Sequence, residues 1–258
     1  MSGKPVKIMV VGAHPLDPFE RAGGTVAKHL ARGDDAMMVS LTAGVVTHAF
    51  GFFPRTGEDK LKDIERVKEM KRAEFERAAK VLGVSAWRCF DFPESPMLLG
   101  LPEYIAMVNL LREYRPDVVI CQHPIEVGRQ DHMDAGRFVM AAVDYCRAEG
   151  FPSPLAPHTV ADLFMSYYQD FRSEQLTGSP RHAPDVIVDI TAVFDKKVAA
   201  MLEFGTTQAK EGPDWQQAWR KGMERLDGGV GFFHGMGYAE QFTRFNPARV
   251  QYLPLAGQ

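Results

Sequence analysis

The sequence predicts an α/β fold that is Rossmann-like: a mainly parallel sheet flanked by helices, with a C-terminal elaboration. Up to residue 150, apolar β-branched runs of strand length alternate with amphipathic stretches of helix length. This alternation implies right-handed crossovers and therefore a parallel sheet. Beyond residue 150 the pattern changes to one rich in glycine and aromatic residues, so the final part of the chain is expected to add to the sheet differently.

The first part of the chain contains four expected strands, each followed by a helix. The strands are expected at 6–13, 36–43, 86–92 and 117–124, and the helices at 18–33, 63–83, 101–116 and 131–150. Pro18 suits the first turn of the first helix, while Gly33 and Gly83 are stop signals. Gly23 and Gly24 are poor helix-interior residues, costing about 1 kcal/mol each. They predict a close approach of another segment, since no Gly-x-Gly-x-x-Gly fingerprint is present.

The C-terminal elaboration is expected to contain strands and helices in a less regular order. The segments are strands within 158–170 and at 185–191, a helix over 192–211 and a short helix near 238–245. No internal repeat, low-complexity stretch or evident linker interrupts the 258 residues. The sequence therefore predicts one domain over 1–258.

Bulk composition restricts the classes of function. The net charge of −3 has mixed signs, which predicts no nucleic-acid partner. No apolar run approaches the roughly 18 residues that a membrane-spanning helix needs, so no membrane association is expected. Three cysteines without Cys-x-x-Cys spacing favour a reducing compartment, and the N-terminus has no signal-peptide layout. These features predict a cytoplasmic protein, and homo-oligomerisation stays open.

Polar residues follow two of the expected strands. His14 and Asp17 come after the first strand, His123 lies at the end of the fourth, and the loop that follows leads to Asp131 and His132. Ligands bind at the carboxyl ends of strands in open parallel sheets. Two histidines and one carboxylate are a typical zinc ligand set, so convergence of these side chains would form a zinc site.

Helix capping is the alternative explanation for the two aspartates. Asp17 precedes Pro18 and lies three residues before Glu20, a good capping pattern for the first helix. Asp131 could cap a helix that begins near His132. Residue pattern alone leaves both explanations open.

Six motifs in order resemble those of the LmbE/PIG-L superfamily of zinc-dependent deacetylases. The first, "GAHPLDPFERAGGT", is similar to the Ala-His-Pro-Asp-Asp-Glu and Gly-Gly-Thr signature of that superfamily. The others are "VSLTAG", "KRAEFERAAKVLGV", "RPDVVICQHP" with its following "DH", "DVIVDITAVFDKKVAAM" and "GYAEQF". The resemblance implies that His14, Asp17 and His132 bind Zn²⁺.

Several positions depart from the superfamily pattern. Leu16 replaces the aspartate that acts as general base in the deacetylases, and leucine cannot accept a proton. Arg129 stands where a histidine is frequent, and Val45 stands where an acidic residue is usual. A histidine near the end of the C-terminal helix is replaced in "MLEFGTTQ". The resemblance therefore retains the metal ligands without several auxiliary groups.

Two reactions and one non-enzymatic role follow from this pattern. The leading expectation is a zinc-dependent hydrolase that cleaves an acyl C–N bond, such as an N-acetyl group, in a small, polar, anionic substrate. The alternative is a lyase that hydrates an unsaturated carboxylic acid, because the 4-oxalomesaconate hydratase branch also lacks the first aspartate. A glutamate usual in that branch is absent at Val45. The third possibility is a catalytically degenerate module that binds metal.

Other residues are candidates for proton transfer and substrate binding. The candidates for proton transfer are Asp131, His123, Glu126 and, from the C-terminal elaboration, His234. The candidates for substrate binding are Arg129, which could bind a carboxylate through two hydrogen bonds, His48 in the loop after the second strand, and Tyr168.

Overall fold

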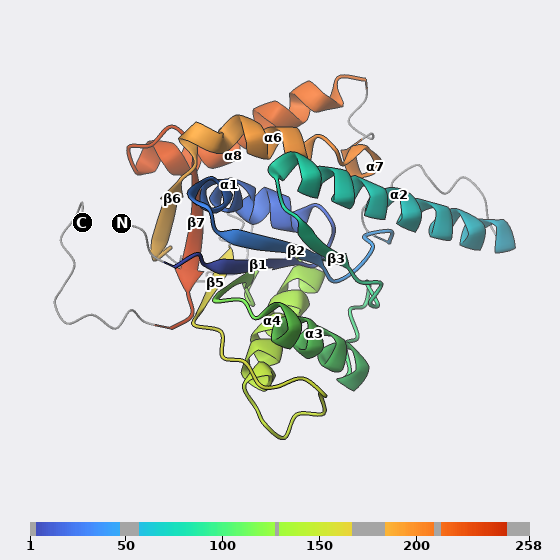
Figure 1. The fold of residues 1–258 in the computed structure, drawn as a ribbon. Coiled ribbons are helices and arrows are strands. Elements are labelled where there is room, and N and C mark those ends of the chain that lie inside the picture. Colours follow the sequence, from blue (N-terminus) through green and yellow to red (C-terminus); the bar gives the residue numbers. More distant parts are fainter. Residues whose placement is uncertain (1–3, 47–56, 127–128, 167–183, 209–212, 247–258) are drawn as a thin grey trace.

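A seven-stranded sheet forms the centre of the molecule (Figure 1). The computed structural model describes residues 4–46, 57–126, 129–166, 184–208 and 213–246. The strand order is β3-β2-β1-β4-β5-β7-β6. The strands are β1 (Lys7–Gly12), β2 (Asp35–Ser40), β3 (Ala86–Cys89), β4 (Val118–Gln122), β5 (Asp162–Ser166), β6 (Val186–Asp189) and β7 (Ala239–Arg244). The first five strands pair in parallel, which confirms the predicted fold class.

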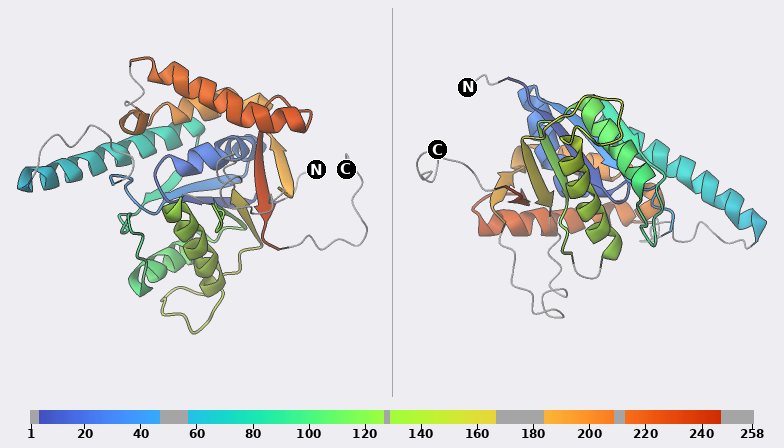
Figure 2. Two further views of the ribbon diagram at one scale, coloured as in Figure 1. Left: turned by 180° about the vertical axis from the view of Figure 1, so that it is seen from behind. Right: turned by 90° about the horizontal axis from the view of Figure 1, so that it is seen from below.

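Helices cover both faces of the sheet (Figures 1 and 2). They are α1 (Asp17–Arg32), α2 (Glu58–Leu82), α3 (Leu101–Tyr114), α4 (Gln130–Cys146), α6 (Phe194–Met201), α7 (Gly205–Gln208) and α8 (Trp215–Phe233), with a 3₁₀ turn, η1 (Thr191–Val193). Helices α1, α2, α6 and α8 lie on one face, and α3 and α4 lie on the other. Each face buries its own apolar cluster, as expected for a sheet between two helical layers.

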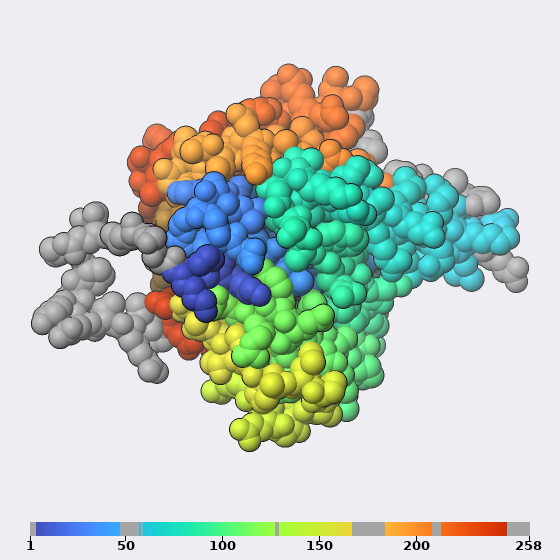
Figure 3. Space-filling model, in the orientation of Figure 1, coloured from blue at the N-terminus to red at the C-terminus, as the bar shows by residue number. Residues whose placement is uncertain are grey.

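The ends of several helices match the glycine signals in the sequence. Gly33 and Gly83 adopt left-handed conformations with φ of 95° and 88°, and they end α1 and α2. Helix α2 begins at Glu58, earlier than the start predicted at residue 63. Its N-terminal half projects beyond the rest of the molecule (Figures 1 and 3). None of the described helices is long and apolar enough to cross a membrane.

The C-terminal elaboration contains the largest difference from the sequence prediction. The segment near 238–245, predicted to be a short helix, is strand β7, which pairs antiparallel with β5 and β6. Ala239 and Phe242 of this strand are buried. A segment of this length is too short for its apolar periodicity to distinguish a helix from a strand, so the sheet pairing decides. Helix α8 was not predicted, and the helix predicted over 192–211 is divided between η1, α6 and α7.

Close packing explains Gly23 and Gly24 within α1, as predicted. A Cβ on Gly24 would lie 2.7 Å from two side-chain carbons of Ile190, and one on Gly23 would lie 3.3 Å from Lys197. The two carboxylate oxygens of Glu240 in β7 accept hydrogen bonds from the amides of Gly24 and Thr25 at 2.9 and 2.8 Å. The glycine pair therefore lets the C-terminal segments pack directly against α1.

Candidate metal centre

The candidate site lies at the carboxyl ends of the adjacent strands β1 and β4. His14 and Asp17 lie in the sharp turn that links β1 to α1, where the amide of Asp17 donates to the carbonyl of His14 at 3.1 Å. Asp131 and His132 lie in the first turn of α4, after β4. Because β1 and β4 pair directly, the two segments meet at the same edge of the sheet.

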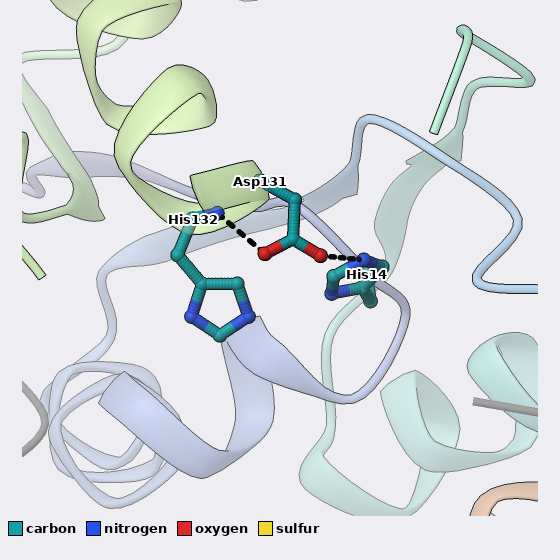
Figure 4. Close-up of side chains that lie close together, drawn as sticks. All are labelled: His14, Asp131 and His132. Carbon is teal, nitrogen blue, oxygen red and sulfur yellow. Dashed lines mark hydrogen bonds and ion pairs between the residues drawn. The ribbon is translucent and has the colours of Figure 1, made fainter. Parts of the chain in front are cut away.

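His14, Asp131 and His132 form a compact group of possible metal ligands (Figure 4). One side-chain ligand atom from each residue lies within 4.8 Å of those of the other two. The Asp131 carboxylate stands between the two imidazole rings, with Oδ2 3.0 Å from Nε2 of His14. Both histidines are 2% exposed. Two imidazoles and a carboxylate are a ligand set that suits zinc.

Asp17 belongs to the same cluster. Its Oδ2 lies 3.3 Å from Nδ1 of His14 and 3.7 Å from Nε2 of His132. The backbone amide of His14 and the side-chain amide of Gln122 each donate to Oδ2 at 2.8 Å. Both hydrogen bonds go to Oδ2, so Oδ1 has none within the described part of the chain. This arrangement fixes the carboxylate and leaves one oxygen for another interaction.

The helix-capping explanation for the two aspartates is not supported. Leu16, and not Asp17, is the N-cap residue of α1, and no side chain caps that end. Arg129 is the N-cap residue of α4, again without a side-chain cap, and Oδ1 of Asp131 accepts from the amide of His132. The carboxylates of Asp17 and Asp131 are instead held beside the histidines.

The charges within the cluster stabilise one another. Burial would raise the pKa of Asp17, but the neighbouring His132, His14 and Arg21 hold it well below its usual value. Burial would lower the pKa of His14, but its hydrogen bonds to Asp131 and Asp17 outweigh burial and raise it to about 9. The cluster thus retains ionised carboxylates, which are the form that binds metal ions.

A second carboxylate contacts His132 from the opposite side. Glu126, in the loop after β4, places Oε1 3.3 Å from Nδ1 of His132. Arg21 of α1 donates from Nη2 to the same oxygen at 2.9 Å. Burial would raise the pKa of Glu126, but Arg21 and His132 lower it. An ion pair therefore adjoins the candidate ligands.

Leu16, which stands where the resemblance implies the aspartate that acts as general base, has apolar surroundings in the fold. Leu16 is buried and belongs to the core cluster that contains Phe19 and Phe75. A different carboxylate, that of Glu94 after β3, lies 3.8 Å from Nε2 of His14. Its oxygens accept from the amides of Val45, at 2.8 Å, and Val46, at 3.1 Å. Glu94 thus brings an acidic group beside Val45, the position at which the resemblance implies an acidic residue.

The remaining residues that the sequence singled out lie in different surroundings. His123 directly follows β4, and its Nδ1 accepts from the amide of Ile125 at 3.1 Å. The side chain of Arg129 is 38% exposed, with Nε 3.7 Å from Oε1 of Glu126, so it lies at the rim. His234 is exposed at the end of α8 and is not brought into the described cluster. His48 and Tyr168 lie outside the described residues.

Three site residues escape the sequence interpretation: Arg21, Glu94 and Gln122. In the sequence, Arg21 is indistinguishable from any other charged residue of α1, and Gln122 is simply the last residue of a buried strand. Glu94 follows β3, so the strand-end argument that selected His14 would also select it. The role of Glu94 depends on its contacts with His14, Val45 and Val46, which are far from it in sequence, and periodicity does not reveal such contacts.

Comparison with known proteins places this geometry in a family. A family model described as PIG-L: GlcNAc-PI de-N-acetylase matches residues 9–143, which include all four residues of the cluster. The chain belongs to the PIG-L family. It is an enzyme of that family, and the curated proteins similar to it include deacetylases and a hydratase.

A hydratase and a deacetylase each align with most of this PIG-L protein. The 4-oxalmesaconate hydratase of Pseudomonas putida is 28% identical over 193 residues, covering 75% of this chain and 70% of that protein. The diacetylchitobiose deacetylase of Thermococcus kodakarensis is 25% identical over 248 residues, covering 93% and 83%. The crystal structure of GalB, the 4-carboxy-2-hydroxymuconate hydratase of Pseudomonas putida, shares the fold. Its TM-score is 0.78 at 22% identity, with 96% of this chain and 100% of that one covered.

Proposed function

We propose that this PIG-L protein binds a divalent metal ion, zinc, and uses it to activate water against a small anionic substrate. The observation that carries the proposal is the group of the two buried histidines, His14 and His132, with the half-buried Asp131 at the sheet edge, and Asp17 beside them. His14, Asp17 and His132 would hold the ion. When bound, zinc supplies a Lewis acid that polarises a substrate oxygen and makes water more acidic.

Asp131 is our candidate for the group that accepts the proton of the attacking water. It carries a carboxylate whose pKa stays low, although burial opposes this, because His14 and His132 stabilise its charge. Its side chain is 17% exposed, more than that of either histidine, so solvent and substrate can reach it. Arg129 at the rim supplies a cation that can bind a substrate carboxylate.

Hydration of an unsaturated carboxylic acid is the reaction that we favour. Leu16 removes the proton acceptor of the deacetylases, and the resemblance assigns the same loss to the 4-oxalomesaconate hydratase branch. The 28% identity to the 4-oxalmesaconate hydratase of Pseudomonas putida supports this choice. Hydrolysis of an acyl C–N bond is the second candidate. It is favoured by the de-N-acetylase family model and by the diacetylchitobiose deacetylase relative.

Product analysis distinguishes the two reactions. The purified protein, loaded with zinc and quantified by elemental analysis, is incubated with unsaturated oxo-dicarboxylic acids and, separately, with N-acetylated amino sugars. Hydration predicts loss of the ultraviolet absorbance of the conjugated double bond and a product heavier by one water. Release of acetate and a free amine would favour hydrolysis instead. Bound zinc without either product would support a degenerate metal-binding module.

A further inference from the structure

Glu126 connects three elements at the candidate metal centre. Its carboxylate oxygen Oε1 lies between the guanidinium of Arg21, on α1, and the ring of His132, on α4. The two distances are 2.9 and 3.3 Å, and each of the three residues is at most 8% exposed. Contacts as buried as these hold a side chain in one orientation far better than surface ion pairs do.

The contacts decide which ring nitrogen of His132 carries hydrogen. A guanidinium has only donors, so Nη2 of Arg21, 3.5 Å from Nδ1 of His132, could bond that nitrogen only if it carried no hydrogen, whereas Oε1 of Glu126 is nearer, at 3.3 Å, and is an acceptor that favours hydrogen on Nδ1. Oε1 of Glu126 can accept from both. With hydrogen on Nδ1, the lone pair of His132 is on Nε2, which faces Oδ2 of Asp17 at 3.7 Å.

The second oxygen of Glu126 argues against a purely structural ion pair. Oε2 is buried and makes no hydrogen bond with the residues that the structure describes. A buried oxygen without a partner costs free energy, so such groups are retained where they serve a function. An apolar residue at this place would avoid the cost but could not accept from His132.

We propose that Arg21 and Glu126 are a positioning pair for His132: Glu126 fixes the ring with hydrogen on Nδ1 and Nε2 toward the metal, and Arg21 fixes Glu126. This inference rests on the proposed function, because it assigns His132 to the metal. It makes Glu126 a positioning residue, whereas the sequence suggested a proton acceptor. Partners of this kind change metal affinity by about 10- to 100-fold when they are removed.

The test measures zinc affinity of the full chain by competition with a chromophoric chelator. Glu126→Gln retains shape and an acceptor but loses the charge, and Glu126→Ala removes both. We expect affinity to fall in the order wild type, Glu126→Gln, Glu126→Ala, with about a 10- to 100-fold total loss. Arg21→Met should weaken binding in the same direction. Asp134→Asn is the matched control, because Asp134 lies outside the cluster on α4, the helix that carries His132. This variant should bind zinc like wild type.

A spectroscopic readout separates positioning from folding. Nitrogen-15 NMR of the imidazoles should place hydrogen on Nδ1 of His132 in wild type, and Glu126→Ala should shift the ring toward the other tautomer. Wild-type affinity and an unchanged tautomer in both Glu126 variants would overturn the positioning pair. If instead the wild-type protein and His132→Ala both fail to bind zinc, the proposed function itself fails. Circular dichroism identifies a variant that has unfolded, in which case Glu126→Gln decides.

Discussion

The carboxylate of Glu94 accepts a hydrogen bond from the backbone amide of Val45 at 2.8 Å, with a second bond from Val46. The resemblance to the LmbE/PIG-L superfamily implies an acidic residue at the position of Val45. The chain therefore lacks that acid locally but receives one from the loop after β3. Because Glu94 also lies 3.8 Å from Nε2 of His14, it ties the loop after β2 to the metal centre.

Removing Glu94 is predicted to destabilise this part of the site. Glu94→Ala removes the acceptor of two amides, that of the buried Val45 and that of the exposed Val46, and the buried one costs about 1–3 kcal/mol. Glu94→Gln keeps an acceptor oxygen and should cost less. Urea denaturation of the two variants checks the order. Equal stability of Glu94→Ala and wild type would show that water replaces the carboxylate without cost.

Asp17 and Asp131 are predicted to have different roles. Asp17→Asn should reduce zinc content together with activity, because we assign Asp17 to the metal. Asp131→Asn should retain zinc and lose activity by about 10²- to 10⁴-fold, the usual contribution of a general base. Elemental analysis and turnover are measured on the same samples. The opposite pattern, with zinc lost only in Asp131→Asn, would make Asp131 the ligand, as its place beside both histidines also allows.

Leu16→Asp is predicted to lower the folding stability and to raise the rate of hydrolysis. Leu16 is 8% exposed within the apolar cluster, so its loss should cost about 2–5 kcal/mol, as for other buried leucines. The new carboxylate restores the family's proton acceptor, and N-acetyl hydrolysis should rise at least about 10-fold. Leu16→Asn is the control, since asparagine has nearly the same size and shape as aspartate and cannot act as a base. Equal hydrolysis by both variants would mean that the missing aspartate does not limit the reaction.

The sequence predicts the elements that local patterns specify. Buried β-branched runs and glycine stops locate β1, β4 and the end of α1, and the strand-end rule brings His14 and His132 together. Strand β7 escapes prediction because six residues carry too little periodicity, and its conformation depends on pairing with β5 and β6. Arg21 and Glu94 escape for a related reason. Their partners are distant in sequence, so the folded chain is needed to show what they contact, although the strand-end rule would also have selected Glu94.

Lys71 gives the protein a predicted dependence of stability on pH. Lys71 is 1% exposed, and its ammonium donates to Oγ1 of Thr207 at 2.9 Å. Burial lowers the pKa of Lys71 to about 8, against the opposing charges of Glu74 and Glu94. Between pH 8 and 10.5 the unfolded chain holds this proton and the folded chain does not. Folding stability due to Lys71 therefore rises with pH, by up to about 3 kcal/mol.

The comparison of Lys71→Met with wild type isolates this contribution. Urea denaturation at pH 7 and 9.5 should show wild type gaining about 2 kcal/mol relative to the variant. Lys80→Met, at an exposed position on the same helix, is the control and should show no such gain. A constant difference between wild type and Lys71→Met would mean that the buried ammonium keeps its proton throughout this range.

Gly23 and Gly24 are predicted to respond differently to alanine. The new Cβ at position 24 meets Ile190 at 2.7 Å, in a buried place where neither chain can move freely, and such overpacking costs about 1–3 kcal/mol. At position 23 the nearest atom, 3.3 Å away, belongs to the flexible chain of Lys197, and helix propensity contributes about 1 kcal/mol in favour of alanine. Gly24→Ala should therefore lower Tm by about 2–12 °C, while Gly23→Ala stays near wild type. Calorimetry of the two variants checks this, and equal Tm values would show that Ile190 moves aside and that α1 does not need its close approach.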